Sequence, residues 1–204
     1  DLVSYDRKHN EANGENNRDG ENFNNSWNCG VEGKTKKQKI CLLRKKQIKN
    51  AFIMLLCSQG TPLILAGDEF ENTQHGNNNP YCIDGETTYL KWKNKELPCE
   101  TLEFVKKLIA LRKEHAVFHM PKQFISANNT SGGFPDISYH GSSAWYQTME
   151  NYDRHIGIMY CENNELVYVA YNMHWESHML GLPKVPAGSH WKIELTSSDD
   201  EKIS

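Results

Sequence analysis

Residues 60–69 read Gly-Thr-Pro-Leu-Ile-Leu-Ala-Gly-Asp-Glu, and this stretch decides the fold. Its apolar part, residues 62–67, is short and continuous, which is typical of a strand buried on both faces of a parallel sheet. Gly60 stands where the C-terminal cap of a preceding helix is expected. A helix, a tight turn and a buried strand together predict one αβ step of a barrel.

A helix is predicted before this strand. Thr35 and Gln38 have the spacing of a capping box, which marks a helix start. Apolar residues then recur on one face at helical spacing: Cys41, Ile48, Phe52, Leu55 and Leu56. Basic residues occupy most of the remaining surface: Arg44, Lys45, Lys46 and Lys49. We interpret this basic run as a solvated helix face and not as an anion site.

A loop and a second helix are predicted after the strand. Asp68 and Glu69 follow at the C-terminal end of the strand, where barrel enzymes build their sites. A loop is expected from Phe70 to about Pro98, and an amphipathic helix over residues 101–115. The residues of this helix that we expect to face inward are Leu102, Val105, Leu108 and Ile109.

Beyond Val117 the pattern changes to short strand-like segments separated by turn residues, which is typical of an antiparallel β-sandwich. The predicted strands are Ile137–His140, Ala144–Thr148, Ile156–Cys161, Leu166–Met173, Met179–Leu182 and Trp191–Leu195. Residues 1–116 are therefore predicted to be the last βα portion of a (β/α)₈ TIM barrel, and residues 117–204 a sandwich domain. A complete barrel needs roughly 250 residues, more than this chain of 204 contains.

The composition is that of a globular protein, with 38% hydrophobic and 24% charged residues and a net charge of −3. Nothing in this balance favours nucleic acid or an anionic membrane surface as a partner. No run approaches the roughly 20 apolar residues of a membrane span, and the first residues do not resemble a signal peptide. The six cysteines are irregularly spaced and include no Cys-x-x-Cys pair, so we expect reduced thiols in a cytoplasmic protein.

The most particular motifs lie in a long polar loop over residues 1–34. This loop contains His-Asn-Glu-Ala-Asn-Gly-Glu at 9–15, Asn-Arg-Asp-Gly at 17–20 and Ser-Trp-Asn-Cys-Gly-Val-Glu-Gly at 26–33. A later stretch, 74–82, reads Gln-His-Gly-Asn-Asn-Asn-Pro-Tyr-Cys. Together with the segment 60–70, these blocks resemble, in the same order, the isoamylase-type glycogen-debranching enzymes of the α-amylase superfamily, glycoside hydrolase family 13.

The resemblance implies retaining cleavage of α-1,6 branch linkages in glycogen or starch-type α-glucans. Such cleavage uses an Asp nucleophile, a Glu acid/base and a supporting Asp on earlier barrel strands, all of them upstream of Asp1. The chain alone is then expected to be inactive, to have the N-terminal remainder of the barrel as its partner, and to self-associate through exposed barrel edges. No cofactor is implied. The alternative is a non-catalytic α-glucan-binding module.

Several polar residues are candidates for sugar binding. In the first loop, these residues either contact sugar hydroxyls or satisfy the backbone of their own loop: His9, Asn10, Glu11, Asn13 and Arg18. Asp68 and Glu69 receive a supporting role at the barrel mouth, since neighbours on a strand point to opposite sides and cannot easily form a catalytic pair. In the later loop the candidates are Asn78, Tyr81 and Asp84.

The aromatic and histidine residues of the last third receive less specific interpretations. Trp145, Trp175 and Trp191 are interpreted as sandwich core in preference to a glucan platform. His174 and His178 stand four residues apart in a pattern of strand and turn, without a third ligand, so no metal site is expected there.

Overall fold

The structure is a computed structural model that describes residues 1–92, 100–126 and 133–198. The chain folds as two compact units. The first unit contains residues 1–58, 62–111 and the described part of 196–204, and the second contains 59–61 and 112–195. Among the described residues, no helix is long and apolar enough to cross a membrane. The division into a barrel portion, residues 1–116, and a sandwich domain, residues 117–204, stays a prediction.

Helix α1 spans Gln38–Leu56, close to the predicted element. Its first turn is not a capping box, because Lys37 occupies the N-cap and makes no side-chain cap. Thr35 Oγ1 instead accepts a hydrogen bond from Lys37 N at 3.2 Å, which closes a turn ahead of the helix. The predicted C-terminal cap was wrong as well: the helix ends at Leu56, and Gly60 has a φ of +88° in the turn beyond it.

The apolar face of α1 is confirmed at its centre, where Phe52 and Leu56 are buried. Lys49 is also buried, although it was predicted to be solvated. Its Nζ lies 2.5 Å from Glu100 Oε1 and 5.6 Å from the centroid of the Phe104 ring. A long lysine stem can cover apolar surface while its charged head is paired, so the basic residue belongs to the packed side of the helix.

Arg44 also departs from the predicted solvated face. Its guanidinium donates hydrogen bonds to three backbone carbonyls: those of Gly33 at 2.7 Å, Asn28 at 2.9 Å and Val31. The planar fork of an arginine suits several acceptors at once. Arg44 therefore fixes the end of the first loop against helix α1.

Helix α2 spans Glu100–Glu114 and agrees with the predicted second helix. Val105 and Leu108 are buried as expected, while Leu102 and Ile109 are only half-buried. The end of the predicted loop before it, residues 93–99, lies outside the described residues, as does Cys99.

The apolar run at 62–67 does not form a strand in this structure. Leu63 and Leu65 are 88% and 57% exposed, and the segment passes directly into a short 3-10 helix, Asp68–Phe70. A strand needs a neighbour to satisfy its backbone groups, and no described segment of the first unit pairs with this one. The buried strand was therefore wrong for this structure, and the barrel itself stays a prediction.

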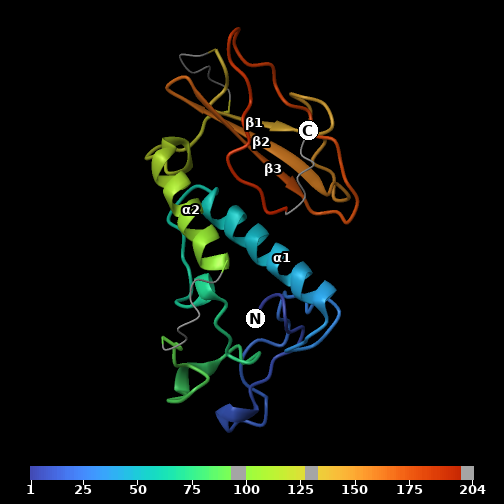
Figure 1. Ribbon diagram of the computed structural model, residues 1–204, viewed down its shortest axis with the longest axis vertical. Coiled ribbons are helices and arrows are strands. Elements are labelled where there is room, and N and C mark those ends of the chain that lie inside the picture. The colour runs from blue at the N-terminus through green and yellow to red at the C-terminus, as the bar shows by residue number, and fades with distance from the viewer. Residues whose placement is uncertain (93–99, 127–132, 199–204) are drawn as a thin grey trace. The chain divides into compact units, whose positions relative to one another are not determined.

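The second unit is built on an antiparallel sheet of strands β1 (Ile137–His140), β2 (His155–Glu162) and β3 (Glu165–Asn172). Strand β2 lies between the other two, as Figure 1 shows. The tight connection from β2 to β3 is made by Asn163 and Asn164, both at positive φ, as the twist of a two-residue hairpin requires.

Three of the six predicted strands are confirmed in this sheet. The segments 144–148, 179–182 and 191–195 are not strands here, and no second sheet forms among the described residues. Residues 191–195 alternate strictly between apolar and polar side chains, so short alternation alone does not supply a strand partner. The predicted sandwich is therefore corrected, for the described residues, to a single three-stranded sheet.

The core of the second unit lies against β2. Met159 and Cys161 are fully buried, and Phe118 packs edge-on to Tyr160 with 5.8 Å between ring centroids. The 3-10 helix Ala116–Phe118 brings Phe118 to this position.

Tyr168 of β3 crosses the sheet over Gly157 of β2. Its hydroxyl donates to the carbonyl of Gly181 at 3.2 Å, and burial raises the pKa of Tyr168 to about 12. A Cβ at Gly157 would lie 1.7 Å from the Tyr168 hydroxyl oxygen. Gly157 is therefore required for the close passage of this ring.

Candidate functional site

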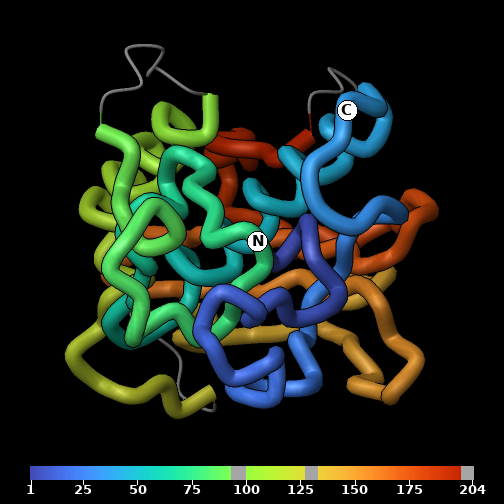
Figure 2. The backbone as a smooth tube through the Cα atoms, turned by 90° about the horizontal axis from the view of Figure 1, so that it is seen from below, coloured from blue at the N-terminus to red at the C-terminus, as the bar shows by residue number. Residues whose placement is uncertain are grey.

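Two segments of the first unit, the loop 1–34 and the later loop 71–82, lie side by side (Figure 2). Polar side chains from both loops join them, and we call this set the asparagine network: Asn10, Asn13, Asp19, Asn77, Asn78 and Asn79. These residues are more than 50 positions apart between the two loops. The network therefore gives two irregular loops a fixed relative position, which neither has by its own secondary structure.

The pair Asn10 and Asn78 forms the centre of the network. Asn10 Nδ2 donates to Asn78 Oδ1 at 2.8 Å, and the backbone N–H of Asn78 donates to Asn10 Oδ1 at 3.0 Å. Asn10 Nδ2 also donates to the carbonyl of Asp19 at 3.0 Å. Asn10 has 0% exposure, so each of these bonds replaces water that the buried amide cannot reach.

A second set of bonds surrounds Asp19. Asn77 Nδ2 donates to Asn13 Oδ1 at 2.6 Å, and Asn13 Nδ2 donates to the carbonyl of Asn79 at 2.8 Å. Asp19 Oδ2 accepts from Asn13 at 2.6 Å and from Asn79 at 2.9 Å. These two hydrogen bonds, that from Asn13 above all, lower the pKa of Asp19. The carboxylate is thereby kept ionised as an acceptor between the loops.

Gly20, next to Asp19, must be a glycine for the loops to approach. Its φ is +72°, and a Cβ there would lie 2.3 Å from Asn78 Oδ1 and 2.5 Å from Asn10 Nδ2. A side chain at this position would therefore separate Asn10 from Asn78.

Glu32 organises the part of the first loop beside the network. Burial alone would raise its pKa, but donors around the carboxylate outweigh that effect and lower the pKa to about 2. The donors are the backbone N–H of Asp6 at 2.9 Å, Asn28 Nδ2 at 3.0 Å, His9 Nε2 at 2.9 Å and the backbone N–H of Arg7 at 3.2 Å. Glu32 therefore sets the orientation of the His9 ring.

The remaining predicted residues of the first loop lie at its surface. Glu11 is exposed in a 3-10 helix, Glu11–Asn13. Arg18 is exposed as well, and its Nε donates to the carbonyl of Glu15 at 3.2 Å. Both side chains therefore present charged groups at the surface of the first loop.

Asp68 and Glu69 occupy different surroundings. Asp68 retains an exposed surface, yet desolvation by the surrounding protein raises the pKa of its carboxyl. Glu69 is half-buried, and its Oε2 accepts a hydrogen bond from the backbone N–H of Gly67 at 2.9 Å. Asp68 is thus the more accessible carboxyl group of the two.

The residues predicted in the later loop are mostly accessible. Tyr81 is 86% exposed, and Asp84 is exposed with Oδ1 accepting from the Tyr89 hydroxyl at 2.6 Å. Trp92 is 71% exposed and tilts against Phe70 with 5.8 Å between ring centroids. Aromatic faces and polar groups are therefore both accessible between residues 81 and 92.

The structure brings Asn10, Asn13 and Asn78 together and places His9 beside them. The side-chain amides of the three asparagines form hydrogen bonds between the two loops, so part of their hydrogen-bonding capacity is used within the protein. Sequence reasoning missed Asp19, Asn77, Asn79 and Glu32 as members of the site. Their signal was present in the Asp-Gly at 19–20 and in the run of three asparagines, but pairing across the chain is not visible in either motif alone.

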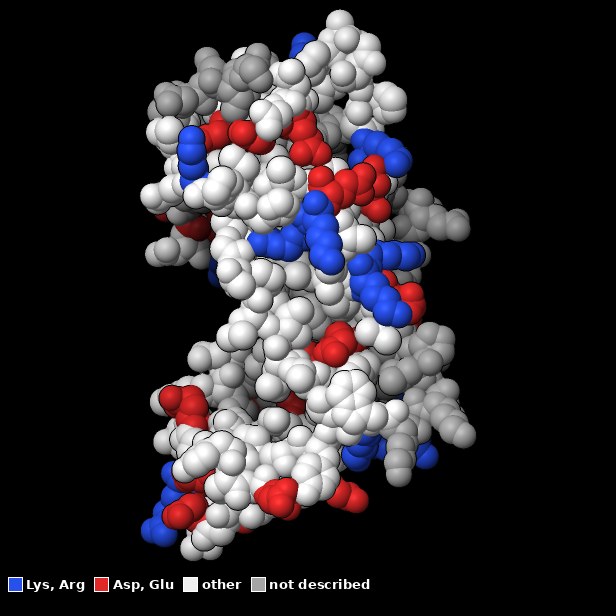
Figure 3. Space-filling model, turned by 90° about the vertical axis from the view of Figure 1, so that its left-hand side faces the viewer, with Lys and Arg blue, Asp and Glu red and all other residues white. Residues whose placement is uncertain are grey.

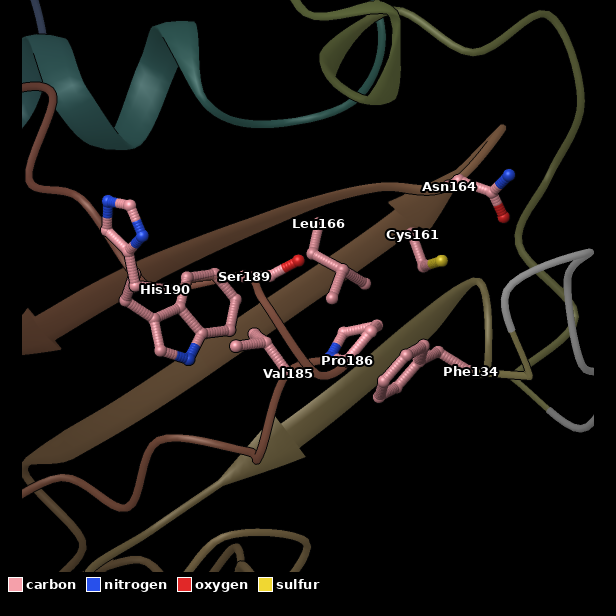
Figure 4. Close-up of a pocket in the computed structure, with 9 residues that line it drawn as sticks. Phe134, Cys161, Asn164, Leu166, Val185, Pro186, Ser189 and His190 are labelled. Atoms are coloured by element: carbon pink, nitrogen blue, oxygen red, sulfur yellow. The ribbon is translucent and has the colours of Figure 1, made fainter.

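The second unit holds a cavity of about 280 Å³ between the β2–β3 hairpin and the segment 185–191. Figure 4 shows Cys161 and Leu166 extending from the hairpin toward Val185 and Pro186. None of the predicted site residues lines this cavity.

No site is singled out by charge on the face drawn in Figure 3. On the face in Figure 3, basic and acidic side chains are interspersed among uncharged ones. Among the described residues, no group of three or more His, Cys, Asp or Glu could hold a metal ion. The five cysteines that the structure describes, 29, 41, 57, 82 and 161, are free thiols.

The chain is similar to curated proteins over most of its length, although no protein-family model matches it. It is 47% identical over 155 residues to the glycogen operon protein GlgX homolog of Mycobacterium tuberculosis, covering 76% of this chain and 22% of that protein. It is 36% identical over 200 residues to the chloroplastic isoamylase 1 of Arabidopsis thaliana, covering 97% of this chain and 24% of that protein. The GlgX homolog of Haemophilus influenzae is 52% identical over 120 residues, 56% of this chain and 18% of that protein.

The matched region is therefore about a quarter of the length of these relatives. The similarity to GlgX homologues and isoamylases confirms the resemblance that the motifs at 9–33, 60–70 and 74–82 indicated. The chain belongs to the isoamylase-type family that contains the GlgX homologues and the plant isoamylases.

Proposed function

We propose that the chain is part of a glycosidase that cleaves α-1,6 branch linkages in glycogen or starch-type α-glucans. The observation that carries this proposal is the identity of 36% to an isoamylase over 97% of the chain. A GlgX homolog, named as a glycogen operon protein, supports the same class of substrate.

The two loops form one wall of the sugar-binding cleft. The asparagine network holds this wall rigid, so that its exposed groups keep fixed positions relative to one another. Glu11, Arg18 and Tyr81 are among the residues of the wall that a glucan can reach, since all three are exposed. Charged groups bind sugar hydroxyls by hydrogen bonding, and the face of Tyr81 suits the C–H surface of a pyranose.

The chemistry is retaining and needs two carboxyl groups roughly 5 Å apart on either side of the scissile bond. Asp68 and Glu69 are adjacent in sequence, and Glu69 is engaged with the backbone N–H of Gly67. They contribute to substrate positioning. The Asp nucleophile, the Glu acid/base and the supporting Asp belong to the part of the longer protein that precedes this chain. The chain alone is therefore inert.

The test is the release of reducing ends from glycogen and amylopectin by the purified chain, alone and mixed with the preceding part of the protein. Activity in the mixture only is expected. Within the active mixture, Tyr81→Ala should raise KM with kcat little changed, since a stacking contact is present in both ground and transition states. Asn22→Ala, at an exposed position of the first loop, is the control for a substitution at the surface of the wall.

Branch cleavage by the chain alone would refute the assignment of the catalytic carboxylates. An inactive mixture of two folded parts would count against the function itself. The free thiols accord with a reducing compartment such as the cytoplasm, which we propose as the location.

A further inference from the structure

The three tryptophans of the second unit have different surroundings. Trp145 stacks on Phe134 with 6.1 Å between ring centroids. Trp191 is half-buried, and its Nε1 donates to the carbonyl of Pro183 at 2.9 Å. Trp145 is 49% exposed and Trp175 is 90% exposed, so the interpretation of these two residues as core was wrong. A tryptophan offers a large apolar area, which is normally buried or used in recognition.

The exposed indole is supported from one side. The ring of Trp175 stacks on that of His174, with 4.1 Å between centroids and 28° between planes. This imidazole covers one face of the indole and leaves the rest of it accessible. The position of Trp175 is therefore not that of a freely rotating surface side chain.

The turn that carries both rings is closed by three hydrogen bonds. The backbone N–H of His174 donates to Asn172 Oδ1 at 2.9 Å, and that of Glu176 donates to His174 Nδ1 at 3.0 Å. Asn172 Nδ2 donates to the carbonyl of Glu176 at 2.8 Å. These bonds fix the His174 ring and, through it, the indole. A surface ordered in advance loses less conformational entropy when it binds a ligand.

A row of polar groups extends from His174, the ring that stacks on the indole. The His174 ring meets the ring of His178 edge-on at 4.9 Å, and His178 stacks on His155 at 4.5 Å. His155 Nε2 lies 3.3 Å from the Ser142 hydroxyl. The Glu176 side chain is 72% exposed. An apolar face with hydrogen-bonding groups beside it matches a pyranose, which has C–H surfaces and a rim of hydroxyl groups.

We propose that Trp175, backed by His174, is a second α-glucan contact that stacks on one glucose unit of a linear α-1,4 segment. The geometry argues for a stacking site, and the choice of an α-glucan rests on the proposed function. The histidines and Glu176 bind hydroxyl groups beside the stacked ring. This site needs no branch point and no catalytic carboxylate, so it works separately from the cleft.

The experiment measures the binding of maltoheptaose, an unbranched α-1,4 glucan, to the 204-residue chain by isothermal titration calorimetry. Trp175→Ala is expected to weaken binding about tenfold, the size of effect typical of losing one aromatic anchor. Trp175→Phe should retain affinity within about threefold, since a ring remains available for stacking. The control is Ile125→Ala: Ile125 is 62% exposed and lies near Asp136, at the opposite end of β2 from His155.

Equal affinity of Trp175→Ala and the unaltered chain, with both folded by circular dichroism, would overturn the proposal. The absence of any maltoheptaose binding by the unaltered chain would overturn it too. A change in sedimentation on substitution, with glucan affinity unchanged, would instead assign the surface to a protein contact. Branch cleavage by the reconstituted mixture is measured separately. Failure of the proposed debranching function is therefore distinguished from failure of maltoheptaose binding at Trp175.

Discussion

Replacement of Asn10 by alanine should destabilise the first unit by about 3 kcal/mol. The substitution removes three side-chain hydrogen bonds: two to Asn78, at 2.8 and 3.0 Å, and one to the carbonyl of Asp19, at 3.0 Å. Each such bond contributes about 1 kcal/mol net, and a buried group left without a partner costs about 1 to 3 kcal/mol. Asn78 is exposed, so water can bond to its side chain once Asn10 is gone, and each of the three lost hydrogen bonds is taken at about 1 kcal/mol.

The assay is urea unfolding followed by circular dichroism, with amide hydrogen exchange to localise the effect. Exchange should accelerate over residues 9–20 and 76–79, and helix α1 should be less affected. Asn10→Asp should also destabilise, because it keeps the acceptor for Asn78 N but removes both donated bonds. Asn22→Ala is the control, since exposed positions without such contacts usually change stability by less than about 0.5 kcal/mol.

A loss of stability below about 0.5 kcal/mol for Asn10→Ala would refute the reasoning. It would mean that the two loops are not held together by the asparagine network. Equal acceleration of amide exchange over the whole first unit would mean that Asn10 does not act locally on the two loops.

Three further outcomes follow from the structure. The ionised Glu32 carboxylate stabilises the fold above about pH 4.5, because its pKa is lowered to about 2, and this contribution is lost as the pH falls toward about 2. The difference in urea midpoint between the unaltered chain and Glu32→Gln should therefore shrink over this window. A constant difference would contradict the hydrogen-bond account. Gly157→Ala should lower stability by about 1 to 3 kcal/mol in thermal unfolding, because the new Cβ meets the Tyr168 hydroxyl. The control Gly85→Ala should be nearly neutral, since its new Cβ makes only an ordinary contact at 3.8 Å. Equal effects of the two substitutions would show that Tyr168 moves freely. The exposed Leu63 should promote self-association of the chain, so Leu63→Lys should reduce the concentration dependence of the sedimentation coefficient. An unaltered chain that is monomeric at every concentration would exclude self-association through Leu63.

The helices and three strands could be predicted because their signals are local. Apolar spacing placed α1 and α2 within a few residues, and two asparagines between alternating segments mark the β2–β3 hairpin. The run at 62–67 has an equally clear local signal but forms no strand, because pairing depends on a neighbour and not on the run itself.

The site shows the same limit. The motif at 9–15 predicted a polar loop and contributed to the family resemblance, which the comparisons confirm. The sequence could not show that Asn10 and Asn13 are used by Asn78 and Asn77, since these partners are more than 60 positions away. Charge patterning also failed for Lys49, where one distant carboxylate on α2 decides whether the side chain is solvated or packed.

From the contacts of Arg44 we predict an order of folding. One guanidinium on the first half of α1 is the shared donor for three carbonyls of the turn at 28–33. These carbonyls cannot converge on it until the helix has formed and presents the side chain, whereas the helix can nucleate on its own within about a microsecond. We therefore expect α1 to form first and to act as the template on which residues 28–33 of the first loop settle.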